Sequence, residues 1–430
     1  MTRKETYRRI LIRFIWFMIL FTCLFSYWYL RGRIPGKLHV ITGEEDQFRF
    51  SIPLGGTLES DDEEVALGTP SNIPEGAARI TGKPVAVGGR EAFTLSCSET
   101  GSYRMTVKLF GWLPLKEIQV EAVEQKELIP GGEAVGIYLE TEGVMVVGTS
   151  ELTDEQGVVT EPAYGALQSG DYILEADGKE TPDKETLIEA ISGTEGRACT
   201  FKIRREEEIL ETRVKTVKTE DGSIKAGIWV RDDAQGIGTL TYADQNGRYG
   251  VLGHAMSDSD TGKRFEVSGG TLEKANIQDV IRGRSGTPGS LLGTIVYGNG
   301  ILGTVKKNTE AGVFGSLEAD QIPDGEPLPV GFKQDVVPGP AVIRCPADGT
   351  VQEYEIEILK ADPAASGNKG MVVQVTDERL LQLTGGIVQG MSGSPIIQNG
   401  RLVGAVTHVF ISDSTKGYGI FLEDMLEAAE

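Results

Sequence analysis

The chain has 430 residues, 40% of them hydrophobic and 24% charged, so it is too long for one ordinary core and too mixed for a disordered or fibrous protein. A formal charge of −21 and a pI near 4.7 argue against nucleic-acid binding, because an acidic surface repels phosphates. With 56 glycines, 18 prolines and 7% aromatic residues, the composition predicts many turns and short strands. We therefore expect a mainly β protein of two to four domains.

Cysteine and histidine usage argues against metal chemistry. The four cysteines are scattered without any C-x-x-C pair, and there are only three histidines. Neither a zinc site nor a dense disulfide framework is available from such a set. We expect no metal and no cofactor.

The N-terminal segment has the features of a membrane anchor. No charged residue occurs from Phe14 to Leu30, a length close to the minimum for a helix that crosses a bilayer. Five basic residues and a single acidic residue precede this run, which predicts a cytoplasmic N-terminus and an exported remainder. A cleaved signal peptide is the alternative, but no small-residue cleavage site follows, and Tyr27–Tyr29 resembles an interfacial aromatic belt. We expect an uncleaved transmembrane helix in residues 1–33.

The next region, residues 34–126, contains short runs of alternating apolar residues such as Tyr103–Leu109. This alternation is typical of strands with one buried face and predicts a small β domain. It contains no residues arranged for chemistry.

Residues 127–219 resemble a PDZ domain. The resemblance lies in Pro162-Ala163 and in the run Gly170-Asp171-Tyr172-Ile173-Leu174 with Asp177-Gly178, followed by a helix from Lys184. Gly165-Ala166-Leu167 departs from the more usual Ala-Gly-Leu. PDZ domains bind an extended peptide along a sheet edge beside a helix, so the resemblance implies a peptide ligand, which could be the protein's own chain. It places the peptide-binding loop at Gly131, Gly132, Gly136, Ile137 and Tyr138. The alternative is an empty groove that packs on a neighbouring domain.

The chemistry is concentrated in residues 220–430. Gly390-Met391-Ser392-Gly393-Ser394-Pro395 has the pattern G-x-S-G-x-P, in which glycines allow backbone N–H groups to converge as an oxyanion hole requires. The predicted donors are the N–H groups of Gly390 and Ser392. Asn399-Gly400 follows between two apolar runs and predicts a two-residue hairpin.

The pattern alone is not specific, because Gly283-Arg284-Ser285-Gly286-Thr287-Pro288 also fits it. Only Ser392 is followed by an apolar strand, an Asn-Gly turn and a return strand. We therefore interpret Ser285 as a loop residue.

A nucleophilic serine needs a base, and the only histidines are His39, His254 and His408. His39 lies just after the membrane segment and is expected at the surface. His254 follows a β-like run and has small neighbours. A hairpin turning at Asn399-Gly400 would place Ser392 opposite Thr407, next to His408, so proximity alone leaves both His254 and His408 open.

These motifs together resemble the stage IV sporulation protein B peptidases, which are serine peptidases of chymotrypsin-like fold. The resemblance rests on Gly253-His254-Ala255, Val375-Thr376-Asp377 and the Ser392 loop, together with the membrane segment and the PDZ-like region. It implies a chymotrypsin-like double β-barrel peptidase domain with His254 as base, Asp377 as acid and Ser392 as nucleophile. Thr407 would then lie behind these residues, and His408 would line the substrate cleft.

The family resemblance also implies a function and a location. It implies a peptidase, anchored in the forespore inner membrane, that cleaves a membrane regulatory protein between the forespore membranes. That cleavage would trigger processing of a sigma factor precursor, and the peptidase could also cleave itself. The alternatives are a non-catalytic PDZ scaffold and a general envelope quality-control protease.

The acid is the position least fixed by the sequence. Asp377 precedes Ser392 by only 15 residues, whereas digestive chymotrypsin-like enzymes place the acid nearer the histidine. Asp377 could instead be a turn residue, with Asp258 or Asp279 as the acid. An acid is expected because it orients the imidazole and stabilises the imidazolium.

Overall fold

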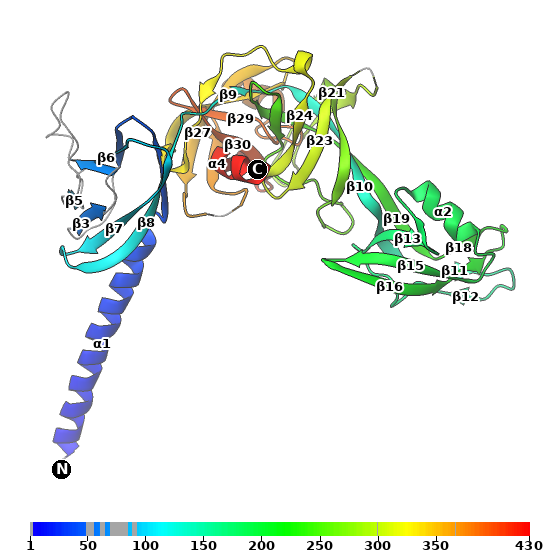
Figure 1. Cartoon of the computed structure of the whole chain (residues 1–430), viewed down its shortest axis with the longest axis horizontal. Helices are drawn as coiled ribbons and strands as arrows, with labels where there is room; N and C mark the ends of the chain where they lie inside the picture. The colour runs from blue at the N-terminus through cyan, green and yellow to red at the C-terminus, as the bar shows by residue number, and fades with distance from the viewer. Residues whose placement is uncertain are drawn as a thin grey trace. The chain divides into compact units, whose positions relative to one another are not determined.

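The computed structural model describes residues 3–48, 56–60, 65–68, 85–87, 93–298, 300–365 and 367–430. The chain divides into two compact units, Met1–Lys126 and Glu127–Glu430 (Figure 1). Strands predominate in the described residues of both units, which confirms the predicted mainly β class.

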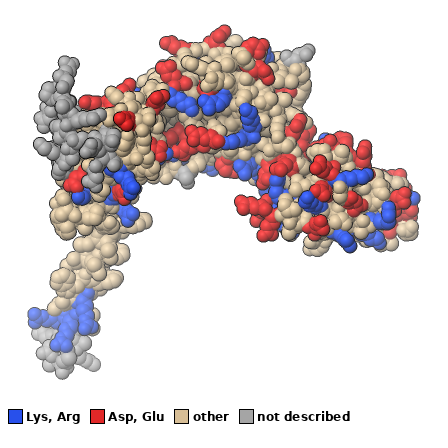
Figure 2. Space-filling view, viewed as in Figure 1, with Lys and Arg blue, Asp and Glu red and all other residues tan. Residues whose placement is uncertain are grey.

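The first unit begins with a long helix, α1, which spans Arg3–Arg33. Its segment Tyr7–Gly32 has a mean hydropathy of 2.0, is not buried inside the structure, and is long and apolar enough to cross a membrane. Figure 2 shows Lys and Arg gathered toward the N-terminal end of this helix, with a body free of charge beyond them. The predicted apolar helix is therefore confirmed.

Two sheets follow α1 in the first unit. A five-stranded sheet and a three-stranded sheet enclose a core that includes Leu95, Met105 and Ile118. The five-stranded sheet has the order β1 (Lys37–Ile41), β8 (Leu113–Val123), β7 (Gly101–Leu109), β3 (Gly56–Ser60), β5 (Val85–Val87). The three-stranded sheet has the order β2 (Asp46–Phe48), β6 (Phe93–Cys97), β4 (Val65–Gly68). Leu30 and Ile34, at the end of α1, also belong to this core.

In the second unit, six strands pair in a ring, the first barrel. In order around the ring they are β10 (Ala134–Thr149), β21 (Val267–Ile281), β23 (Ile301–Thr309), β24 (Gly312–Leu317), β20 (Arg248–Val251) and β19 (Ile228–Ala243). The ring closes because β19 also pairs with β10. Shorter strands border it: β9 (Glu127–Pro130), β25 (Leu328–Pro329) and β22 (Ser290–Ile295). Alternate residues of β10, including Val135, Ile137 and Leu139, fill the interior.

The second half of β10 and the first half of β19 extend out of the first barrel and begin and end the PDZ-like module, residues 142–233. Its other main elements are β13 (Tyr172–Ala176), β15 (Ala198–Arg205), β16 (Glu208–Lys215) and α2 (Lys184–Ser192). Short strands complete it: β11 (Leu152–Thr153), β12 (Val159–Thr160), β14 (Lys179–Glu180), β17 (Val217–Lys218) and β18 (Ile224–Lys225). Asp183 caps α2 in a capping box with Thr186. The module is thus inserted between two strands of the barrel.

The last six strands of the chain form a second barrel. Its strands, in order, are β26 (Gly339–Cys345), β27 (Gln352–Ala361), β28 (Met371–Val375), β31 (Asp413–Phe421), β30 (Arg401–Phe410) and β29 (Pro395–Gln398). The helical elements around the two barrels are α3 (Glu378–Thr384), α4 (Leu422–Ala429) and the short 3-10 helices η1 (Ala319–Gln321) and η2 (Lys333–Asp335). The predicted double β-barrel is therefore confirmed.

The predicted hairpin at Asn399-Gly400 is confirmed, but its register changes along the strands. Both turn residues have positive φ, 53° and 73°, as a two-residue turn of this type requires. Pairing is regular at Gln398–Arg401 and Ile397–Leu402, and then shifts so that Pro395 pairs with Ala405. The uniform register that placed Ser392 opposite Thr407 is therefore wrong, because an irregularity near Val403 moves the pairing by one residue.

Candidate active site

Ser392 lies on a loop between α3 and β29 that passes close to the first barrel. Gly390 and Gly393 have φ of 96° and 95°, in the left-handed region that favours glycine. A β-carbon at Gly393 would lie 2.1 Å from the carbonyl oxygen of Thr239 and 2.6 Å from the nitrogen of Leu252. Only glycine therefore allows the loop to lie this close to β19 and to the end of β20.

Two threonines of β19 bind this loop. The N–H of Thr239 donates to the carbonyl of Ser392 at 2.9 Å, and its hydroxyl donates to the carbonyl of Gly390 at 2.8 Å. The hydroxyl of Thr241 donates to the carbonyl of Gly393 at 2.8 Å. The first barrel thus fixes the carbonyls of the Ser392 loop.

The N–H groups predicted as oxyanion donors are free in this arrangement. Across the described residues, neither Gly390 N–H nor Ser392 N–H makes a hydrogen bond within the protein. The N–H groups of Met391 and Gly393, in contrast, donate to Val388 and Val406. A loop that leaves two backbone donors unused beside a serine has the hydrogen-bonding capacity that an oxyanion needs.

His254 follows β20 through a strained turn. Leu252 and Gly253 have φ of 70° and 69°, and a leucine rarely adopts this conformation. A β-carbon at Gly253 would lie 3.0 Å from Cγ2 of Thr407 on the second barrel. The turn therefore brings His254 across to β30, where its ring lies 4.9 Å from the ring of His408, centre to centre.

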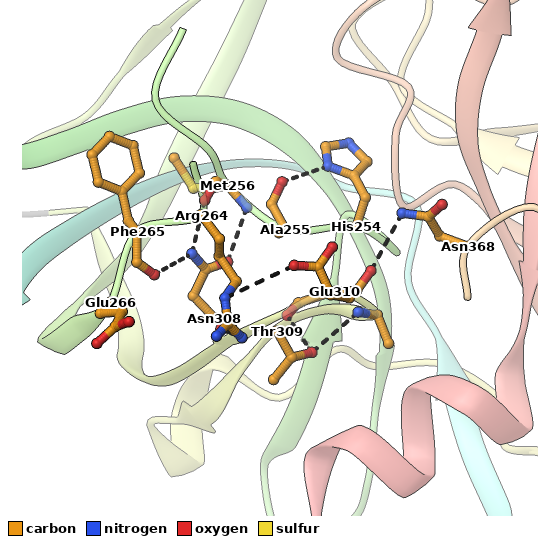
Figure 3. Close-up of polar contacts among 12 residues, drawn as sticks. His254, Ala255, Met256, Arg264, Phe265, Glu266, Asn308, Thr309, Glu310 and Asn368 are labelled. Carbon is orange, nitrogen blue, oxygen red and sulfur yellow. Dashed lines mark hydrogen bonds and ion pairs between the residues drawn. The ribbon is translucent and has the colours of Figure 1, made fainter. Parts of the chain in front are cut away.

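A buried asparagine holds the segment after His254 (Figure 3). Asn308 on β23 accepts from the N–H of Met256 at 2.9 Å and donates to the carbonyls of Met256 and Phe265, both at 2.8 Å. Ala255, which lies between His254 and Met256, presents its carbonyl to Nδ1 of His254 at 2.8 Å. When Nδ1 carries the proton and donates to this carbonyl, Nε2 is left as the basic nitrogen.

The hydroxyl of Ser392 donates to the carbonyl of Thr407 at 2.8 Å. Thr407 is fixed in turn, because its own hydroxyl donates to the carbonyl of Asn368 at 2.8 Å. No hydrogen bond of the described residues joins the Ser392 hydroxyl to His254 or His408. The hydroxyl must therefore give up its bond to the Thr407 carbonyl before an imidazole can accept its proton.

Both imidazoles favour the neutral form. Burial lowers the pKa of His254, against the opposing effect of its bond to Ala255. Burial, followed by the charges of His254 and Lys369, lowers the pKa of His408 to about 4. At neutral pH the site therefore contains two neutral imidazoles, one of which can act as a base.

The structure places Asp377 away from this pair of imidazoles. Asp377 is the N-cap of α3, and its carboxylate accepts from the N–H groups of Arg379 and Leu380 and from the Arg379 guanidinium at 2.7 Å. These bonds, led by that of the Arg379 side chain, lower the pKa of Asp377. The expected hydrogen bond from an N–H of His254 to the Asp377 carboxylate is absent from the described residues.

The alternative acids are also engaged elsewhere. Asp258 is buried, pairs with Arg231 and accepts from the N–H groups of Asp260 and Thr261. Asp279 accepts from the N–H of Val280. The Nδ1 partner of His254 is instead the carbonyl of Ala255, which no sequence motif indicated.

The glycine loop that the PDZ resemblance assigned to peptide binding lies in the first barrel. Gly131 and Gly132 donate to the carbonyls of Thr241 and Leu240 on β19. Gly136, Ile137 and Tyr138 pair with β19 on one side and with β21 on the other. Both edges of this stretch are therefore occupied, and none is left for an added peptide strand.

The sequence did not predict the roles of Thr239, Thr241, Ala255 and Asn308. Ala255 belongs to the Gly253-His254-Ala255 motif, but the motif assigns no role to its backbone carbonyl. The other three act through partners far away along the chain. The alternation Thr239-Leu240-Thr241 could have indicated two hydroxyls on one face of a strand, but not their contact with the Ser392 loop.

The fold and the site define a serine peptidase with two β-barrels. Residues 222–426 match the family described as SpoIVB peptidase S55. The chain therefore carries a SpoIVB-type serine peptidase domain and is a hydrolase that acts on peptide bonds.

Solved structures similar to part of the chain include two PDZ domains of SdrC-like proteins. The domain from Listeria monocytogenes is 22% identical and covers 21% of this chain and 87% of its own, with a TM-score of 0.17. The domain from Listeria innocua is 26% identical and covers 20% of this chain and 93% of its own, with a TM-score of 0.16. A comparison with curated proteins found no match.

Proposed function

We propose that the protein is a membrane-anchored serine endopeptidase in which Ser392 is the nucleophile and His254 the general base. The observation that carries this proposal is the meeting of the two barrels: the Ser392 loop is bound to β19, and the turn after β20 brings His254 to β30. The Ser392 loop, which leads into the second barrel, is thus held by the first barrel, and His254, which follows a strand of the first barrel, lies against the second.

The chemical sequence follows from these groups. Nε2 of neutral His254 accepts the Ser392 proton as Oγ attacks the substrate carbonyl carbon, and the carbonyl π electrons move to its oxygen. The free N–H groups of Gly390 and Ser392 bind the resulting oxyanion. The imidazolium then protonates the leaving amine, and water hydrolyses the acyl-enzyme by the same route.

The orientation of His254 can come from the Ala255 carbonyl, which is already in place. Orientation of His254 by Asp377 remains the untested alternative, since its carboxylate would first have to leave Arg379 and the N-terminus of α3. His408 is proposed to line the cleft beside His254, with Thr407 behind the serine.

The family match supports a proposal for the protein substrate and the location. We propose that α1 anchors the chain in the forespore inner membrane with the second unit exported. There it would cleave a membrane regulatory protein and so trigger sigma factor precursor processing. A non-catalytic scaffold would not need a serine flanked by two unused N–H donors and a neutral imidazole.

For the PDZ-like module we propose a different peptide edge from the one expected. Residues Ile228–Arg231 of β19 pair with β10 on one side, while α2 packs against β13, β18 and β19. Across the described residues, no strand pairs with the other edge of this stretch. An extended segment of substrate, or of the protein's own chain, could add there beside α2.

The test is hydrolysis of a peptide library by the full chain in detergent, read by mass spectrometry together with self-cleavage sites. Wild type should cleave, and Ser392→Ala should not. Equal cleavage by both would overturn the enzymatic proposal for this site and favour the scaffold.

A further inference from the structure

Two aromatic side chains project from the tip of the β7–β8 hairpin in the first unit. Phe110 is 62% exposed and Trp112 is 72% exposed. Phe110 and Gly111 have φ of 55° and 78°, and the N–H of Trp112 closes the turn on the carbonyl of Leu109. Asn, Asp or Gly is preferred at such positions, so the turn itself does not call for phenylalanine.

The hairpin lies beside the upper end of α1 (Figure 1). The Tyr27 hydroxyl donates to the carbonyl of Pro114 at 3.4 Å, and the Lys116 ammonium donates to the carbonyl of Ile34. Pro114, two residues after Trp112, is therefore in contact with a helix residue inside the apolar span.

The chain direction places the tip on the membrane side of Ile34. Going back along β8 from Lys116 to Pro114, the partner on the chain of α1 changes from Ile34 to Tyr27, so this end of the hairpin runs back along α1. From Lys116 back to Trp112 is four residues, or up to about 13 Å of extended strand. That length corresponds to roughly nine residues of helix, which reaches the level of Phe25.

The chemistry of this level suits aromatic side chains. Trp28 and Tyr29 on α1 are exposed there, at 75% and 46%. Tryptophan and tyrosine concentrate where hydrocarbon meets headgroups, and the exposed Arg31 nearby can reach anionic headgroups.

We propose that Phe110 and Trp112 insert into the outer interface of the bilayer that α1 crosses, so that the small β domain is held to the membrane at two points. The inference rests on the anchoring role proposed above for α1. The partner is the lipid surface itself, and the effect is to restrict how the domain can swing about the end of the helix.

The experiment uses three variants of the full chain, each retaining one of the four tryptophans and carrying phenylalanine at the others. They retain Trp16, Trp112 or Trp229. Trp229 is the matched control, because it is 67% exposed but lies on β19 of the second unit. Each is reconstituted into phosphatidylcholine–phosphatidylglycerol vesicles containing lipids brominated near the headgroup end of the acyl chain.

Trp16 reports the anchor, and Trp112 reports the hairpin. We expect bromolipid to quench Trp16 and Trp112, with a blue shift of Trp112 emission, and to leave Trp229 unchanged. Quenching of Trp16 with no more quenching of Trp112 than of Trp229 would overturn the inference and leave the anchor intact. Absence of quenching at Trp16 would contradict both the anchoring role proposed for α1 and the inference that rests on it. All four tryptophans are exposed, so phenylalanine at any of these positions leaves the core unchanged, and far-UV circular dichroism confirms folding.

Discussion

The second unit contains two loops with the same G-x-S-G-x-P pattern but different surroundings. The Ser285 hydroxyl is exposed and donates to the carbonyl of Ser412 at 2.9 Å. Ser392 is partly buried, and its hydroxyl donates to the carbonyl of Thr407, the residue before His408, whose ring lies 4.9 Å from that of His254. The pattern therefore produces a tight serine loop in both places, but a histidine lies beside only one of them.

The backbone donors differ as well. Gly283, the first glycine of the Ser285 loop, donates its N–H to the carbonyl of Thr384. Gly390, its counterpart, donates to no group of the described residues. The comparison shows that a glycine pattern supplies the turn, whereas free donors and a nearby base come from the packing of the two barrels.

Removing each serine hydroxyl in turn tests whether the two loops differ in function. Ser392→Ala should lower kcat on a peptide substrate by a factor on the order of 10⁶, because no nucleophile remains. Ser285→Ala, the matched control, should retain wild-type turnover. The measurement is peptide hydrolysis by the full chain in detergent, and comparable losses in both variants would mean that the two loops are not functionally distinct.

Substituting each histidine in turn tests which of the two imidazoles is the base. His254→Ala should also lower kcat by a factor on the order of 10⁶, since Ser392 then has no base. His408→Gln should retain most turnover while raising KM, because a cleft-lining group contributes mainly to binding. The base assignment fails if His408→Gln is inactive and His254→Ala remains active.

Much of this comparison was accessible from the sequence. The Ser392 loop and the Asn399-Gly400 turn follow from local patterns of glycine and apolar residues, whereas the two barrels were implied by the family resemblance. The placement of Gly131–Tyr138 did not follow, because this stretch is extended in either context and only long-range pairing with β21 assigns it to the barrel. The Ala255 carbonyl and the Asn308 side chain were inaccessible for the same reason: their roles depend on contacts formed in three dimensions.

The pH dependence of activity tests the role of His254 as the base. Burial lowers its pKa below the ordinary 6.5, and a general base must be neutral, so activity should persist below pH 6.5 and fall as pH drops through the lowered value. The measurement is kcat/KM against pH, with circular dichroism at each pH as a control for folding. An acid limb centred above pH 6.5 would contradict a buried imidazole as the base.

The smallest expected effect is that of Asp377→Asn. Asparagine can still cap α3, and only the ion pair with the exposed Arg379 is lost, so turnover should change by less than about tenfold and stability only slightly. Turnover and thermal unfolding of the purified full chain measure both. A loss approaching 10⁴-fold with normal stability would instead identify Asp377 as the orienting acid.

The central claim is that Ser392 is activated by His254 across the two barrels. The most direct measurement is labelling of the full chain with a fluorophosphonate, which reacts with activated serines, followed by peptide mapping in a mass spectrometer. The account predicts one adduct, on Ser392, that is lost in His254→Ala and retained in His408→Gln and Ser285→Ala. An adduct on Ser285, or labelling of Ser392 that persists in His254→Ala, would contradict it.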